Sequence, residues 1–153
     1  MRIVVAAVGR AREGPEKALF THYADHITAW PFDVREVDLK RKVPAGFESD
    51  AEAELLVAAV PPDACAVALD ERGKPVSSAE LARLLGGLQD EGVRDVAFII
   101  GGADGHGEAV RERADRVISF GRNTWPHMLV RGLLAEQIYR AQQIHAGHPY
   151  HRA

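Results

Sequence analysis

Short apolar segments alternate with helical patterns along the whole chain, and this alternation limits the folds that are open to it. Runs rich in Val, Ile or Ala occur at residues 3–8, 32–38, 64–70, 95–100 and 116–120. Helical patterns lie between them at residues 15–27, 48–60, 78–91 and 107–114, and a long one follows Pro126. Apolar strands separated by helices are typical of parallel sheets covered on both faces, because each parallel pair needs a crossover. We therefore predict an α/β fold with an open, mainly parallel sheet and helices on both faces.

The segment at residues 32–38 differs from the other four strand candidates. It alternates Phe and Val with Asp, Arg and Glu, which indicates one solvated face and a position at the edge of the sheet. The chain has 153 residues, enough for one core, and no repeat or linker divides it. We expect a single domain over residues 1–153.

Cysteine content and hydropathy indicate the cellular compartment in which the protein is expected to act. The lone Cys65 lies in an apolar run, which predicts a small core residue in a reducing environment. The N-terminal apolar run at residues 3–8 is too short for a signal peptide, and no segment approaches membrane-spanning length. We expect a cytoplasmic protein without a membrane segment.

Three loops that follow predicted strands carry glycines and polar groups, at residues 69–74, 101–107 and 121–125. Ligands of open α/β sheets bind beyond the carboxyl ends of the strands. Glycine lets the backbone approach a ligand, and exposed N–H groups can hold an adenine edge, a ribose or a carboxylate. The loops therefore favour an unspecified small-molecule pocket, although isolated glycines also serve only to end strands.

Two standard nucleotide motifs do not fit these loops. Gly105 and Gly107 supply a Gly-x-Gly, but Val110 stands where a Rossmann loop needs its third glycine. Gly73 and Lys74 are followed by Pro75 rather than by Ser or Thr, which excludes a P-loop. The pocket is therefore expected to belong to another class.

The segment after Pro126 predicts a long helix with a broad apolar face. Pro126 suits the first helical turn, with Thr124 as the candidate cap. Glu136 and Arg140 have the favourable i, i+4 order of an ion pair. Most of the apolar face is expected to be core or interface, and its width favours a second partner surface. A twofold dimer is the commonest such solution.

The chain ends in a dense set of polar side chains. Residues 121–153 carry a net charge of about +3, whereas the whole chain has a net charge of −3. We therefore expect the C-terminal end to meet a negatively charged partner.

Three histidines recur at every third position near the end, at His145, His148 and His151. A helix that would bring them together is broken, and no carboxylate or thiolate lies nearby, so no metal site is expected. They are interpreted either as solvated surface residues or, with Tyr150 and Arg152, as a substrate-binding cluster.

Specific residue combinations occur in the strand-end loops and in the C-terminal segment. They are Leu69, Asp70, Gly73 and Lys74, then Ile100, Gly101, Gly102 and Gly105, then Thr124, Trp125, Pro126, His127, Leu129, Val130 and Arg131, then Glu136, Gln137, Tyr139, Arg140, Ala141 and Ile144, and finally Pro149, Tyr150, His151 and Arg152. With these residues the chain resembles the SPOUT-class methyltransferases that act on N3 of a pseudouridine in ribosomal large-subunit (23S) RNA. The resemblance covers essentially the whole chain, and the terminal set is the most specific part.

The resemblance implies a fold and a cofactor that periodicity alone does not predict. Family members have a C-terminal trefoil knot, which shapes a pocket for S-adenosyl-L-methionine and departs from the usual topological rule. By position, the pocket would be lined by Leu69, Gly101, Gly102, Phe120, Gly121, Arg122, Asn123, Thr124 and Trp125. The family often has Leu, Ser and Leu in place of Phe120, Gly121 and Trp125, a change that matters little if the contacts are made by the main chain.

The resemblance also implies a target and an assembly. The target is a pseudouridine in helix 69 of the 23S RNA, modified within the assembled 70S ribosome, and the enzyme acts as a homodimer. A non-catalytic ribosome-binding factor of the same fold, or a SPOUT methyltransferase that acts on another RNA, are the alternatives. Intact glycine loops argue against the non-catalytic alternative.

The chemistry assigns candidate roles to the C-terminal residues. Methylation at N3 requires loss of the imide proton and an in-line attack, so the protein must orient the base and hold the developing anion. We hypothesise that Tyr150 and Arg152 position the base and that His151 assists proton removal or contacts RNA. We expect that Arg35, Lys40, Arg41 and Lys42 form a phosphate-binding surface together with the basic C-terminal end.

Overall fold

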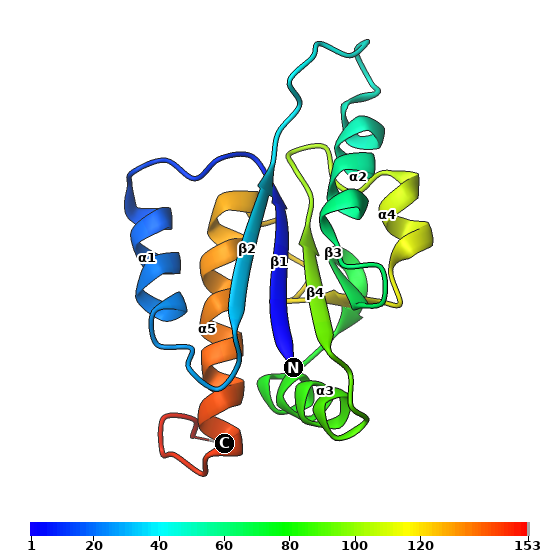
Figure 1. Ribbon diagram of the computed structural model, residues 1–153. Helices are drawn as coiled ribbons and strands as arrows, with labels where there is room; N and C mark the ends of the chain where they lie inside the picture. The colour runs from blue at the N-terminus through cyan, green and yellow to red at the C-terminus, as the bar shows by residue number, and fades with distance from the viewer. Residues whose placement is uncertain (153) are drawn as a thin grey trace.

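One sheet of five parallel strands forms the centre of the molecule. The computed structural model describes residues 1–152, and every pairing between strands of the sheet is parallel (Figure 1). The strands are β1 (Arg2–Val8), β2 (Phe32–Val37), β3 (Cys65–Pro75), β4 (Asp95–Ile100) and β5 (Arg116–Ser119), in the order β2-β1-β4-β3-β5. The predicted parallel sheet is confirmed, and so is the edge position of β2.

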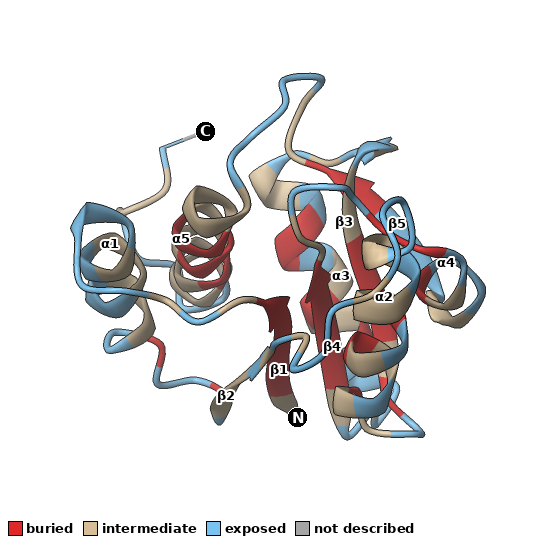
Figure 2. Ribbon diagram, turned by 90° about the horizontal axis from the view of Figure 1, so that it is seen from above, coloured by how far each residue is buried: buried red, intermediate tan, exposed pale blue. Residues whose placement is uncertain are grey.

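Helices cover both faces of this sheet, as predicted. They are α1 (Pro15–Ala24), α2 (Glu48–Ala59), α3 (Ser78–Asp90), α4 (Glu108–Arg113) and α5 (His127–His145). Because side chains alternate along a strand, Ile3 and Val5 of β1 face α3 and α5, whereas Val4 and Ala6 face α2 and α4. The central strands β1 and β4, the first part of β3 and one side of α5 are therefore among the most buried parts (Figure 2). Within residues 1–152, no helix is long and apolar enough to cross a membrane.

Strand β3 is longer than the sequence predicted, and after a bulge its end pairs again with β5. Leu69 and Lys74 both pair with Ile118 of β5, so the residues between them bulge out of the ladder. A Cβ atom on Gly73 would lie 2.7 Å from the carbonyl carbon of Ile118, so only glycine fits there. The trefoil knot itself stays a prediction.

A buried arginine joins α5 to the carboxyl end of β1. The Arg131 side chain is only 4% exposed and forms an ion pair with Glu36 at 2.6 Å. Its Nη2 group donates to the carbonyl oxygens of Val8 (2.8 Å) and Gly9 (2.6 Å). Burial opposes ionisation of Glu36, but the amide of Ala11 and the Arg131 guanidinium outweigh it and lower the pKa of this carboxyl group. The start of α5 is thereby fixed against the edge of the sheet where the strand-end loops meet.

Candidate functional site

A cavity of about 670 Å³ opens at the carboxyl ends of β3, β4 and β5. Its size lies in the range of about 300 to 1,000 Å³ that is usual for small-molecule sites. Of the nine residues predicted to bind a cofactor, eight line the cavity: Leu69, Gly101, Gly102, Phe120, Gly121, Asn123, Thr124 and Trp125. Arg122 is exposed and does not belong to the lining. The predicted loops therefore meet in one place.

The loop after β4 folds into a tight turn at the wall of the cavity. Gly102 and Gly105 form an antiparallel bridge, in which the Gly105 amide donates to the Gly102 carbonyl at 3.1 Å. Gly105 has a φ of +78°, a conformation that suits glycine. A Cβ atom on Gly101 would lie 3.1 Å from the Gly105 oxygen, which is tighter than ordinary packing. Glycine at these positions lets the backbone itself form the wall.

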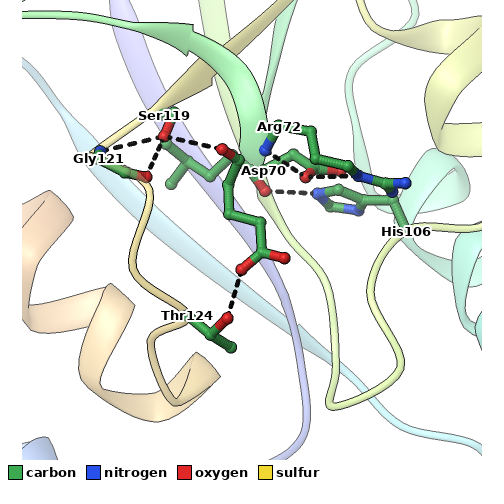
Figure 3. Close-up of polar contacts among 8 residues, drawn as sticks. Asp70, Arg72, His106, Ser119, Gly121 and Thr124 are labelled. Carbon is green, nitrogen blue, oxygen red and sulfur yellow. Dashed lines mark hydrogen bonds and ion pairs between the residues drawn. The ribbon is translucent and has the colours of Figure 1, made fainter.

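His106 ties this turn to the end of β3, and its role was not predicted from the sequence. It is buried, and its Nε2 atom lies 2.8 Å from the Leu69 carbonyl oxygen (Figure 3). A carbonyl oxygen only accepts hydrogen bonds, so Nε2 carries the proton and Nδ1 is an acceptor. Nδ1 is buried without a hydrogen-bond partner in the described part of the chain. Burial lowers the pKa of His106, which favours the neutral ring.

A second set of hydrogen bonds shapes the loop after β5. The Ser119 hydroxyl donates to the Gly121 carbonyl at 2.5 Å and accepts from the Gly121 amide at 3.1 Å. The Thr124 hydroxyl donates to the Glu71 carboxylate at 2.6 Å (Figure 3). The prediction that Thr124 caps the last helix is therefore wrong, because α5 begins at His127 and Pro126 provides no side-chain cap. Thr124 instead links two loops of the cavity.

Carboxylates give the cavity a negative side. Asp70 and Glu71 both belong to its lining. Burial alone would raise the pKa of Asp70, but the backbone amide and the guanidinium of Arg72 outweigh it and lower the pKa. Asp70 is therefore ionised at neutral pH, and this side of the cavity suits a cationic group.

The predicted catalytic residue Tyr150 packs against α5. Its hydroxyl donates to Glu136 at 3.0 Å, and its ring meets the Tyr139 ring edge-on at 4.9 Å. The Arg140 guanidinium carbon lies 4.7 Å from the Tyr150 ring centroid. Burial, with the neighbouring Tyr23 and Glu136, raises the pKa of Tyr150 far above its ordinary value. The hydroxyl is thus protonated at neutral pH.

The predicted ion pair between Glu136 and Arg140 is confirmed, and it contacts the tail as well. Arg140 Nη2 lies 2.5 Å and Nε 3.0 Å from one Glu136 oxygen. Arg140 Nη1 lies 3.3 Å from Nδ1 of His151. Arg152, the third predicted catalytic residue, is exposed. One ion pair on α5 therefore contacts both Tyr150 and His151.

The cavity and the tail occupy different parts of α5. His127 and Val130, at the start of the helix, line the cavity. Glu136, which holds Tyr150, lies nine residues after His127, or about 14 Å along the axis at 1.5 Å per residue. Tyr150, His151 and Arg152 do not line the cavity of their own chain. The predicted cofactor-binding residues and the predicted catalytic residues therefore do not come together within one chain.

Other predicted polar residues have structural partners. His145 donates from Nε2 to the Ala82 carbonyl at 2.7 Å, and His148 Nδ1 accepts from the Tyr150 amide at 3.1 Å. Among residues 1–152, no cluster of His, Cys, Asp and Glu could hold a metal ion. Arg35 pairs with Asp33 at 2.9 Å and donates to the Ala59 carbonyl at 2.7 Å, and its contact with RNA stays a prediction.

The fold and the cavity place this protein among α/β proteins that bind a ligand through glycine loops at the carboxyl edge of a parallel sheet. A family model described as "Predicted SPOUT methyltransferase" matches residues 1–151. The chain therefore belongs to the SPOUT methyltransferase family.

Curated relatives match the chain over its whole length. It is 57% identical over 153 residues to a ribosomal RNA large subunit methyltransferase H of Rhodospirillum centenum, with 100% of both chains covered. A protein of the same name from Paramagnetospirillum magneticum is 54% identical over 152 residues, with 99% of both covered. A solved structure of a probable methylase family protein from Haemophilus influenzae is similar with a TM-score of 0.56 and 10% identity, over 95% of this chain and 66% of that one. At that identity the structural likeness supports the fold alone.

Proposed function

We propose that this protein uses S-adenosyl-L-methionine to methylate N3 of a pseudouridine in helix 69 of 23S ribosomal RNA. The observation that carries this proposal is the cavity lined by eight of the nine residues expected to hold the cofactor. The names of the relatives, which are large-subunit ribosomal RNA methyltransferases, support the substrate class. We further propose that the protein acts as a single domain over residues 1–153 in the cytoplasm.

The cavity suits this cofactor in size, charge and wall chemistry. When bound, the cofactor supplies an electrophilic methyl group on a sulfonium sulfur. The Asp70 and Glu71 carboxylates complement a cationic ligand, and the backbone of Gly101, Gly102 and Gly121 offers close polar contacts. Trp125, which is 39% exposed, offers a ring face at the rim. The unpartnered Nδ1 of His106 adds an acceptor beside the glycine turn.

The separation along α5 supports a homodimer in which each active site combines two chains. Tyr150, His151 and Arg152 lie away from the cavity of their own chain. A twofold dimer brings the same surface of both subunits together, so the tail of one chain can meet the cavity of the other. In this arrangement, Tyr150 and Arg152 orient the base of the target nucleotide, and His151 contacts the same base.

Binding of the RNA would depend on local charge, because the whole chain is acidic with a net charge of −3. Lys40, Arg41 and Lys42 follow the edge strand β2, are exposed, and form no ion pair with other residues in the described range. We propose that they contact phosphates together with the basic tail. So few cations favour weak binding to free RNA and productive binding only to the assembled 70S ribosome.

Methyl transfer from labelled S-adenosyl-L-methionine to purified 70S ribosomes, isolated 50S subunits and free 23S RNA tests this function. The proposal expects label in the 70S reaction at one pseudouridine, located by mass mapping of RNA fragments. Cofactor binding without methyl transfer to any RNA would favour a non-catalytic ribosome-binding factor. Label at a ribose or in transfer RNA would instead identify another substrate for the same fold.

A further inference from the structure

The surroundings of His151 fix which of its ring nitrogens carries the proton. Arg140 Nη1 lies 3.3 Å from Nδ1 of His151. A guanidinium group only donates hydrogen bonds, so Nδ1 must accept, and the single ring proton resides on Nε2. Arg140 itself is held by Glu136, which lies one turn earlier on α5. This contact therefore assigns the proton to Nε2, whose N–H group has no partner among the described residues.

The contacts around this imidazole leave little freedom for another arrangement. Glu136 accepts hydrogen bonds from Arg140 and from the Tyr150 hydroxyl, so the ion pair and the tail hold each other. Hydrogen bonding to Glu136 and its negative charge outweigh burial and raise the pKa of Arg140, so the guanidinium stays charged. No carboxylate contacts His151 in the described range, and the group that faces its Nδ1 is a cation. A second proton on this ring would meet the positive charge of Arg140 directly.

We propose that His151 acts as a hydrogen-bond donor, through Nε2–H, to a carbonyl oxygen of the target base, and that Arg140 is the positioning residue that fixes this tautomer. The inference rests on the proposed function and deepens it. It replaces the hypothesis that His151 removes the imide proton, because a nitrogen that already carries a proton cannot take up another as the neutral base.

The proposed donor role of His151 follows from the negative charge that develops on the target base. N3 of the pyrimidine loses its proton to water or hydroxide, and the resulting negative charge spreads onto the two flanking carbonyl oxygens. The N3 electron pair then forms a bond to the methyl carbon while the carbon–sulfur bond breaks, and its electron pair remains on sulfur. Both products are neutral at the reacting atoms. A donor aimed at a carbonyl oxygen stabilises the anion that precedes transfer, as donors do in oxyanion holes.

Substitution of His151 by glutamine and by alanine distinguishes a role as hydrogen-bond donor from a role as general base. The amide nitrogen of His151→Gln can donate in place of Nε2–H, but the side chain cannot accept a proton. Single-turnover methylation of 70S ribosomes should therefore fall less than about tenfold in His151→Gln and about 100-fold in His151→Ala. A Gln variant as slow as the Ala variant, or an Ala variant as fast as the wild type, would overturn the proposal.

The pH profile gives a second readout. Arg140 faces the ring directly, and the titratable and charged groups of the surrounding network are Glu136 and Tyr139 of α5, Tyr23 and His26 of α1, which pack on Tyr139, and Tyr150 and His148 of the tail. With solvent as the proton acceptor, the rates of wild type and His151→Gln should rise with pH in parallel. An inflection near the ordinary imidazole pKa of about 6.5, present in wild type and lost in His151→Gln, would show that the ring is the base.

The tautomer can be measured without cofactor or RNA. Long-range proton–nitrogen correlation spectra of the full-length protein distinguish the two tautomers, and the His151→Gln spectrum assigns the signal among the seven histidines. The proposal expects the proton on Nε2 in wild type and a loss of that preference in Arg140→Met. A proton on Nδ1 in wild type would overturn it. A wild-type protein that shows the expected tautomer but methylates no RNA would contradict the proposed function instead.

Discussion

The two ends of α5 have different kinds of structural surroundings. Around its start, the cavity is lined by three loops in which glycines bring the backbone close and the side chains of His106, Ser119 and Thr124 hold the loops together. Beyond its middle, the tail is held by a network of side chains centred on Glu136 and Arg140. A backbone wall depends on the path of the chain, whereas a side-chain network depends on individual functional groups.

This difference teaches where each kind of substitution should act. Changes that shift the backbone at the carboxyl edge of the sheet should reduce stability and cofactor binding together. Changes in the tail should reduce turnover and leave the cavity intact. A tail variant that loses cofactor binding, or a cavity variant that loses only turnover, would contradict this division. Variants that affect only the expected property would support it.

Arg131→Met tests whether the backbone at the cavity end needs its buried anchor. Removing the buried guanidinium leaves two carbonyl groups without that donor and leaves Glu36 with only the Ala11 amide, which should lower the free energy of unfolding by about 3 to 5 kcal/mol. Chemical denaturation measures this loss. A loss below about 1 kcal/mol would show that the edge is fixed by other contacts.

The pH dependence of the same variant has a defined sign. Glu36 has a lowered pKa in the folded state, so its contribution is present above the unfolded value near 4.5 and is lost as pH falls through the folded value. The difference in stability between wild type and Arg131→Met should therefore narrow in acid.

Gly73→Ala tests the close approach of β3 and β5. The added Cβ atom would lie 2.7 Å from backbone atoms of Ile118, which cannot move aside as a side chain can. We expect a loss of about 3 kcal/mol in the free energy of unfolding. Gly87→Ala is the matched control, because Gly87 lies inside α3 with open space around it and should gain about 0.5 to 1 kcal/mol. Equal thermal midpoints for both variants would contradict the packing argument.

Arg152→Ala tests the other side of the comparison. Removing a cation that orients the base should slow turnover on ribosomes about 100-fold while binding of S-adenosylhomocysteine stays unchanged. Arg83→Ala, an exposed arginine on α3, serves as the control and should leave both quantities unchanged. Weakened cofactor binding in Arg152→Ala would contradict the division of roles between the cavity and the tail.

His106→Leu has the smallest expected effect. It removes the donor to the Leu69 carbonyl and the unpartnered Nδ1, and should weaken S-adenosylhomocysteine about tenfold in calorimetric titrations. Glu108→Gln, an exposed neighbour, is the control. An unchanged affinity would show that His106 is a packing residue only.

Much of the cavity could be predicted because parallel strands end at the same edge of a sheet. Apolar runs placed the strands, so the loops that follow them had to meet. The resemblance to the family supplied the particular residues, and eight of them line one cavity. The end of β3, residues 71–75, was missed because Glu71, Arg72 and Lys74 are charged, and strand prediction relies on apolar runs. Their pairing with Ile118 is a long-range contact that no local pattern encodes.

The buried polar residues were missed for a related reason. Arg131 and His106 are charged or polar types that usually lie at the surface, and only their partners across the fold explain their burial. The one signal for His106 was a single imidazole within a run of glycines. The sequence allowed a tail lent by the opposite subunit, but the distance between the tail and the cavity of the same chain depends on the fold.

Mixing two inactive variants tests the central claim most directly. Gly101→Val should block the cavity, since even a Cβ atom there lies 3.1 Å from Gly105 and His106, and Arg152→Ala should disable the tail. After subunit exchange, half of the dimers are mixed and each contains one intact site, so about a quarter of the wild-type methylation rate on 70S ribosomes should return. No recovery in a sample whose mixed dimers are verified by native mass spectrometry would contradict an active site shared between two chains.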